Sequence, residues 1–183
     1  MRLPAVLAAF ALLALALPAA AREKRPVTAR RVEQEIAAGG AKKALSRLYD
    51  DEAAWESVTS RIAEGGNDWL TIAERLLSVA SDPAAYDLEA AVGDALAAAP
   101  EHVLAIADEK GEIAVSWVCA ETATVAEDPS DEERIDLLSE REKAVTSVKD
   151  PALAKKRSAC LQGLARARQA VERELRESTR KIG

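Results

Sequence analysis

The two cysteines of the chain, Cys119 and Cys160, can react covalently with each other. Such a pair can form a structural disulfide, remain as two buried thiols or act as a redox centre. Redox pairs normally have the C-x-x-C spacing, which this sequence lacks. An even number of cysteines in an exported chain favours a structural bond. We therefore predict a Cys119–Cys160 disulfide that closes a loop of about 42 residues and stabilises the fold by about 4 kcal/mol.

The single histidine, His102, and two acidic clusters are the other groups suited to catalysis. A zinc site would need His102, both cysteines and a carboxylate, which is an unusual ligand set for an oxidising compartment. The clusters at 50–52 and 128–133 place acids where new helices should begin, and acids there complement the helix dipole. We expect no catalytic, cofactor-binding or metal site, although a pair of carboxylates at an unknown separation leaves a hydrolase as an alternative.

Residues 1–21 have the pattern of a secretory signal peptide. Arg2 precedes an apolar run over 6–17, Pro18 ends the run, and three alanines at 19–21 offer a cleavage site after the last of them. The alternative, a retained membrane anchor, would require about 20 apolar residues, which is longer than this run. No cysteine follows the run, which argues against a lipoprotein. We predict a bacterial protein that is periplasmic or secreted, without a stable membrane span after cleavage.

Charge divides the remaining chain into three parts. Residues 22–31 have a net charge of +4, and residues 149–183 have ten basic and four acidic residues, a net charge of +6. Between them, residues 32–148 have nine basic and 26 acidic residues, a net charge of −17. Basic ends can lie against an acidic body, stay solvated or contact an anionic surface. The acidic middle and the predicted export both argue against a nucleic-acid partner.

Apolar residues recur at helical spacing through most of the chain. Asn67 is a candidate N-cap for a helix that carries its apolar stripe over 69–80. The Asp82-Pro83 pair is suited to begin the next helix, and Pro100 stops that helix or begins another. Consecutive helices with short connections and many alanines should pack as antiparallel hairpins.

Alternating patterns typical of strands are scarce, and aromatic residues make up only 3% of the chain. Residues 113–125 are apolar nearly all round at their start, which indicates a buried helix, with a buried strand as the alternative. A last helix is expected over 152–178. We predict an all-α fold of about eight helices, in stacked antiparallel hairpins or an irregular bundle, with one disulfide. The predicted parts are the signal peptide, a basic N-terminal segment at 22–40 and a single helical domain at 41–183.

Five short stretches carry a resemblance to a known group of sequences. These stretches are W-L-x-I-A-x-x-L at 69–76, A-L-x-x-x-P at 95–100, Val103-Leu104, Cys119 and D-P-A-L-x-x-K-R-x-x-C-L at 150–161. They resemble a diffuse group of exported bacterial helical proteins over roughly residues 41–165. The motifs are packing and cysteine positions, so the resemblance implies a helical fold and a disulfide and implies no activity.

The sequence contains no phosphate-binding loop, nucleophile elbow, zinc-protease motif or dinucleotide fingerprint. We therefore expect an exported, non-enzymatic protein-binding module, such as an adaptor, an inhibitor or an immunity-type protein. The acidic middle of the chain favours a basic protein partner by electrostatic complementarity. One alternative is a small carboxylate-based hydrolase or lyase of envelope material, and another is an apolar ligand carrier, which needs a sizeable cavity. Trp55, Trp69 and Trp117 either fill the core or line a groove.

Overall fold

The computed structural model describes residues 26–108, 113–120 and 129–182, and the predicted signal peptide lies outside these ranges. Within them the chain is helical and contains no named strand. In chain order the elements are α1 (Ala29–Gly39), α2 (Ala41–Tyr49), α3 (Glu52–Ala63), α4 (Asn67–Leu77), α5 (Ala84–Asp94), α6 (Pro100–Ile106), α7 (Val115–Ala120), α8 (Asp131–Ser147), the 3-10 turn η1 (Pro151–Leu153) and α9 (Ala154–Ile182).

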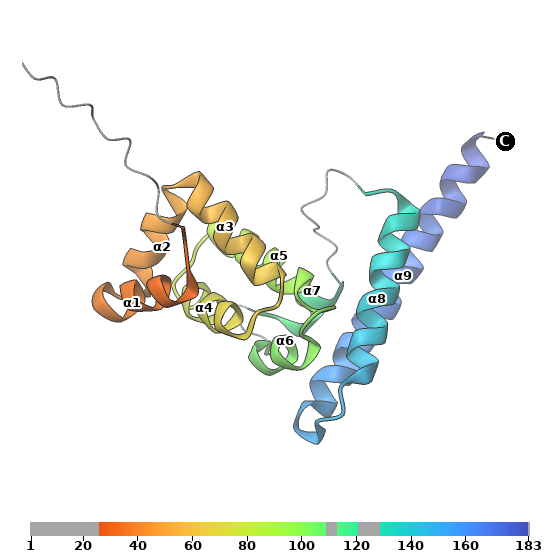
Figure 1. Ribbon diagram of the computed structural model, residues 1–183. Coiled ribbons are helices and arrows are strands. Elements are labelled where there is room, and N and C mark those ends of the chain that lie inside the picture. Colours follow the sequence, from red (N-terminus) through yellow and green to blue (C-terminus); the bar gives the residue numbers. More distant parts are fainter. Residues whose placement is uncertain (1–25, 109–112, 121–128, 183) are drawn as a thin grey trace, which may run out of the picture.

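The helices form two parts that meet along one side (Figure 1). Helices α1–α6 make up one part, which we call the body, and the long antiparallel helices α8 and α9 make up the other, which we call the hairpin. The short helix α7 packs against α5 of the body and α9 of the hairpin. The predicted all-α fold with one disulfide is confirmed.

Helix α4 is the centre of the body, because it packs against α1, α2, α3, α5 and α6. Its buried stripe consists of Leu70, Ile72, Ala73, Leu76 and Leu77. Each large aliphatic side chain buried in this way stabilises the fold by about 1.5–3 kcal/mol. Val32 and Ile36 of α1 belong to the same core, so the first helix of the body is anchored by apolar packing.

Polar side chains begin three of the elements as local capping rules require. Asp51 accepts a hydrogen bond from a backbone N–H in the first turn of α3, at 3.3 Å. Ser130 and Glu133 form a capping box at the start of α8, in which each side chain accepts from the backbone N–H of the other residue. Asp150 accepts a backbone N–H of η1 at 2.8 Å. These caps satisfy N–H groups that the helices leave without an internal partner.

Two helix starts differ from the sequence expectation by one position. The carbonyl of Gly66 accepts the backbone N–H of Leu70 at 2.9 Å, which makes Gly66 the N-cap and Asn67 the first residue of α4. The carbonyl of Pro83 accepts the N–H four residues later at 3.3 Å, so Pro83 is the N-cap and α5 begins at Ala84. Neither N-cap residue accepts a hydrogen bond through its side chain.

The segment predicted as a buried helix over 113–125 is helical over Val115–Ala120. Just before it, Asp108 and Ala114 form an isolated bridge, and the described part of the segment contains no strand, so the helix and not the strand alternative is found there. Residues 121–125 lie outside the described ranges.

Among the described residues, the side-chain contacts that join the hairpin to the rest of the molecule include a disulfide, an ion pair and a hydrogen bond to a backbone carbonyl. The predicted disulfide is present between Cys119 of α7 and Cys160 of α9, whose Cα atoms are 5.3 Å apart. Arg141 of α8 donates to Asp94 of α5 at 2.9 Å. Lys156 of α9 donates to a backbone carbonyl of α6, also at 2.9 Å. The hairpin is therefore fixed by one covalent and two charge-assisted ties in addition to its apolar contacts.

Candidate functional site

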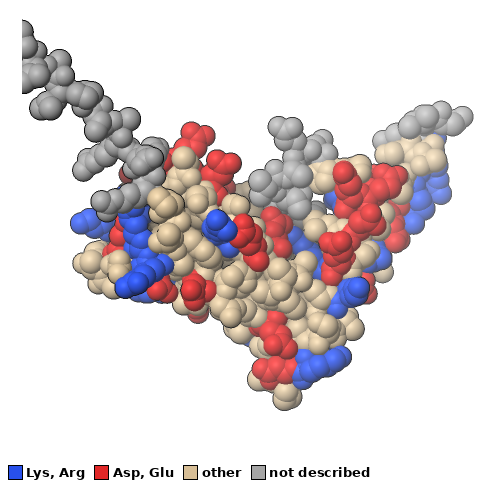
Figure 2. Space-filling view, viewed as in Figure 1, with Lys and Arg blue, Asp and Glu red and all other residues tan. Residues whose placement is uncertain are grey.

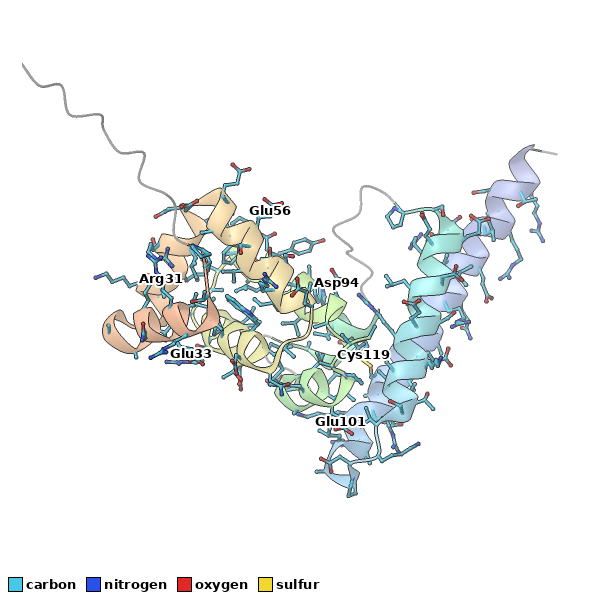
Figure 3. All side chains as sticks on the ribbon, in the orientation of Figure 1. Arg31, Glu33, Glu56, Asp94, Glu101 and Cys119 are labelled. Atoms are coloured by element: carbon cyan, nitrogen blue, oxygen red, sulfur yellow. A yellow bond between two sulfur atoms is a disulfide. The ribbon has the colours of Figure 1, made fainter. Side chains whose placement is uncertain are left out.

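A surface groove of about 770 Å³ lies between α3 and α5 of the body. Its lining residues are Glu52, Trp55, Glu56, Thr59, Ser60 and Ala63 of α3, and Tyr86, Asp87, Ala90, Ala91 and Asp94 of α5. We call it the acidic groove, because four of these residues are carboxylates and none is basic. Figure 3 labels one carboxylate from each wall, Glu56 on α3 and Asp94 on α5.

The acidic groove follows from helical periodicity on two neighbouring helices. On each helix the lining residues recur three or four positions apart, which places them on one face. Three of them, Ala63, Ala90 and Ala91, are alanines, which leave space that larger side chains would fill. Between Asp87 and Asp94 the groove follows α5 for about 10 Å at the rise of an α-helix. The two helix faces therefore leave a hollow that is lined by small and polar side chains.

Two aromatic side chains shape the groove. Trp55 is 9% exposed, and its indole N–H donates to Oδ2 of Asp87 at 2.8 Å, which ties α3 to α5. Tyr86 is 52% exposed and meets Trp117 of α7 edge-on, with ring centroids 5.8 Å apart. Trp55 thus belongs both to the core and to the groove. At this position the tryptophan both fills the core and lines a groove, which were the two alternatives.

Asp94, the last residue of α5, connects the groove to the hairpin. Its Oδ1 accepts from Nη2 of Arg141, whose side chain is only 1% exposed. Burial raises the pKa of Asp94 above its ordinary value of 3.8, and the guanidinium of Arg141 opposes that shift. The ion pair neutralises the charge of Asp94 at this end of the groove. Asp94 therefore contributes less unpaired negative charge than the other carboxylates.

Glu52 and Glu56 carry open negative charge on the α3 wall. They lie four residues apart on one helix face, and both are exposed. Within residues 26–108, 113–120 and 129–182, neither side chain makes a hydrogen bond or an ion pair. Like charges at this spacing destabilise a helix by a few tenths of a kcal/mol. A cation bound between them would remove that cost.

The structure keeps apart the residues whose types suggested chemistry. Cys119 and Cys160 are fully buried between α7 and α9, away from the acidic groove. His102 lies in the first turn of α6, and its Nδ1 is 2.9 Å from the side-chain oxygen of Asn67. Of the acidic cluster at 50–52, Glu52 reaches the groove and Asp51 caps α3. Of the acidic cluster at 128–133, residues 131–133 begin α8, and Asp128 lies outside the described ranges.

The sequence analysis missed the acidic groove as a site. A signal was present, because Glu52 and Glu56 on one segment and Asp87 and Asp94 on another recur at helical spacing among alanines. What the pattern could not supply is that α3 and α5 lie side by side, since this pairing skips α4 in the chain.

Basic residues gather on a different part of the body. Lys42, Lys43 and Arg47 line shallow hollows of about 630 and 270 Å³ on α2, where acidic residues also occur. Figure 2 shows blue side chains over α1 and α2 and red side chains over one end of α3 and over α8. Charged side chains line all three hollows, and each hollow opens onto the surface.

Comparisons with known proteins add no family. The chain matches no protein-family model, and it has no significant match among curated proteins or solved structures. Among the described residues, no group of histidine, cysteine and acidic side chains is arranged to hold a metal ion. None of the helices in the same ranges combines the length and the apolar character needed to cross a membrane. A functional assignment therefore has to come from the groove itself.

Proposed function

We propose that this protein is an exported, non-enzymatic protein-binding module whose acidic groove receives a basic segment of its partner. One observation carries the proposal. A groove between two packed helices combines four carboxylates with the exposed ring of Tyr86 and contains no basic residue. Complementary charge directs association and suppresses wrong partners, while aromatic anchors supply much of the binding energy at protein interfaces.

The dimensions of the groove suit a short stretch of polypeptide. Its α3 wall, from Glu52 to Ala63, is about 16 Å long at the rise of an α-helix. An extended chain rises about 3.3 Å per residue, so about five residues of a partner would cover this length. The walls are helices held by core packing, so the groove is formed before the partner arrives and little binding energy is spent on ordering it.

The disulfide supports the exported part of the proposal. Bonds such as Cys119–Cys160 form and persist in oxidising compartments and are rare in the cytosol. Together with the predicted signal peptide, this bond supports a bacterial periplasmic or secreted location. A basic protein of the same compartment is the partner that the groove would take.

A comparison of two charge variants in pull-downs from a bacterial envelope extract tests the proposal. Glu52→Gln/Glu56→Gln removes two carboxylates from the groove. Glu132→Gln/Asp136→Asn removes two exposed carboxylates with the same spacing from α8, and in both pairs the first residue lies in the first turn of its helix. The oxidised protein and both variants would be compared at several salt concentrations, and the retained protein would be cross-linked to locate its contact.

The proposal predicts that a basic protein is retained by the unmodified chain and by the α8 variant. It should be lost from the groove variant and released as the salt concentration rises, because salt screens exposed charges. Its cross-links should fall on α3 and α5. Equal retention by both variants, or cross-links confined to other elements, would contradict the groove as the binding surface.

A second candidate function is a small hydrolase or lyase that acts on envelope material through carboxylate chemistry. One observation favours it: Asp94 lines the groove, and burial raises its pKa, as is typical of a general acid. Asp94→Asn would then abolish turnover of purified envelope polysaccharide or cross-linked peptide, and Glu132→Gln would leave turnover unchanged. Absence of turnover by the unmodified protein on such material contradicts this candidate.

A further inference from the structure

We propose that the acidic groove selects arginine over lysine, because a guanidinium can stack on Tyr86 while the neighbouring carboxylates bind its N–H groups. This inference rests on the proposed function and specifies the chemistry of the partner's anchoring side chain. It concerns Tyr86, Glu56 and Asp87, which line the same end of the groove. The hydrogen bond from Trp55 to Asp87 places Glu56 and Tyr86 at the same end, because Trp55 precedes Glu56 and Asp87 follows Tyr86 in the sequence.

Tyr86 lines the groove, and about half of the residue is exposed. Its ring stands at 77° to that of Trp117, and a contact between nearly perpendicular rings covers at most one face of either. At least one face of Tyr86 is therefore left uncovered by Trp117, in agreement with its 52% exposure. Trp117 also limits the freedom of the ring, so a stacked cation would lose little to ordering Tyr86. A cation over such a face is attracted by the negative charge of the ring face.

The carboxylates around Tyr86 match the shape of a guanidinium. Asp87 uses Oδ2 for the indole of Trp55, and a carboxylate has a second oxygen that can accept another donor. Glu56 has an exposed side chain across the groove. A planar guanidinium has five N–H donors in a fixed fork, so it can stack on a ring and donate to carboxylates at its edge together.

Lysine cannot use both features in this way. Its ammonium is a compact and strongly hydrated charge, so stacking it on Tyr86 costs more hydration than stacking a guanidinium. It would still be attracted by Glu52 and Glu56 through their net charge. The groove should therefore bind both types of basic peptide and prefer the arginine type through Tyr86.

Two synthetic peptides of equal charge, octa-arginine and octa-lysine, test this inference with the full mature chain in its oxidised form. Calorimetry at low salt should give an affinity for octa-arginine about fivefold higher than for octa-lysine. Tyr86→Leu should bring the two affinities together by weakening octa-arginine alone, and Tyr86→Phe, which keeps the ring, should keep most of the preference. Circular dichroism of each variant checks that the helices are intact.

The charge variants distinguish the selection of arginine from the more general binding of basic segments in the groove. Glu52→Gln/Glu56→Gln should weaken the binding of both peptides by about tenfold, since it removes two exposed ion pairs with the peptide. Glu132→Gln/Asp136→Asn should weaken their binding much less. Equal affinities for the two peptides, or a preference that Tyr86→Leu leaves unchanged, would overturn arginine selection while the groove remained the site for basic segments. If neither peptide binds, or if both charge variants weaken binding alike, the proposed function fails as well.

Discussion

The body and the hairpin are both helical, but they are stabilised in different ways. Helix α4 of the body has 11 residues and buries five of them, all apolar. Helix α8 of the hairpin has 17 residues and buries three, and one of these is Arg141. The body is therefore organised around the apolar stripe of one short helix, whereas α8 buries a much smaller share of its residues.

This difference explains why a disulfide and a buried ion pair lie at the junction. A helix that buries few apolar residues gains little from the hydrophobic effect, so the hairpin depends on specific contacts for its position. The disulfide from α7 to α9 and the ion pair between Asp94 and Arg141 supply these contacts. Because Asp94 also lines the acidic groove, the junction holds one end of the proposed binding surface.

Loss of the disulfide should separate the behaviour of the two parts most clearly. For Cys119→Ala/Cys160→Ala, the chain-entropy model predicts a loss of about 4 kcal/mol in the free energy of unfolding. Amide hydrogen exchange should show the largest loss of protection in α8 and α9, because their position relies on this bond. Urea unfolding measures the loss, and exchange read by mass spectrometry locates it.

A truncation inside the body gives the matched control. Leu76→Ala on α4 removes a fully buried side chain and should cost about 3 kcal/mol. In this variant the loss of protection should spread through the helices that pack on α4 and should not concentrate in the hairpin. If Cys119→Ala/Cys160→Ala lost amide protection equally in the body and in the hairpin, the two parts would not differ in the way they are stabilised.

The ion pair at the junction should give the next largest effect. Arg141→Met should cost about 3 kcal/mol, because it leaves the carboxylate of Asp94 largely buried without its cation. The double variant Arg141→Met/Asp94→Leu, which removes both charges, should recover much of this loss. Urea unfolding of the two variants against the unmodified protein measures both changes.

The pH dependence of Arg141→Met follows from the raised pKa of Asp94. A raised pKa in the folded state means that the stability contributed by Asp94 falls as the pH rises from its ordinary value of 3.8 to its folded value. Removal of Arg141 takes away the charge that opposes this shift, so the pKa rises further. The deficit of the variant should therefore be small below the ordinary value and grow as the pH rises. A deficit that is constant with pH would contradict this account.

An exposed arginine on the hairpin sharpens the contrast with Arg141. Arg168 of α9 donates to Ser139 at 2.9 Å and to Glu142 at 2.8 Å, both on α8, and its side chain is partly exposed. Arg168→Met should cost only about 0.5 kcal/mol, because water and salt compensate exposed charges. The effect should also shrink at high salt. A loss as large as that of Arg141→Met would mean that burial is not what distinguishes the two arginines.

Local features of this fold could be predicted from the sequence, because they depend on neighbouring residues. Helical spacing gave the all-α class, the Ser130 and Asp150 caps follow from residue types, and the disulfide followed from an even pair of cysteines in a chain expected to be exported. Asn67 shows the limit of such rules, because its side chain meets His102, which is 35 residues away in sequence. Asn67 is a good cap by residue type, but its side chain contacts a residue that is distant in the sequence and does not cap α4.

The acidic groove and the buried ion pair could not be predicted, because they depend on which helices meet. Arg141 and Asp94 are 47 residues apart in the sequence. Helix α8 contains many charged residues, and the sequence neighbours of Arg141 do not distinguish it from the others as a buried one. Glu56 and Tyr86 likewise share a groove only because α3 packs against α5. The junction and the candidate site are therefore properties of tertiary packing.

The capping box of α8 should give the smallest effect and the opposite pH response to Asp94. Hydrogen bonds from the backbone N–H and the hydroxyl of Ser130 lower the pKa of Glu133 below its ordinary value of 4.5. A lowered folded pKa means that the stability from Glu133 is present above the ordinary value and is lost as the pH falls through the folded one. Glu133→Ala should therefore lower the melting temperature slightly near neutral pH and not at strongly acidic pH, where the carboxyl is protonated in both states. Thermal melts at both pH values measure the difference, with Glu132→Ala as the control from the same first turn, outside the capping box. If Glu133→Ala destabilised the protein equally at both pH values, the charge of Glu133 would not contribute to stability. The disulfide and the Asp94–Arg141 ion pair would then account for the position of the hairpin without the capping box.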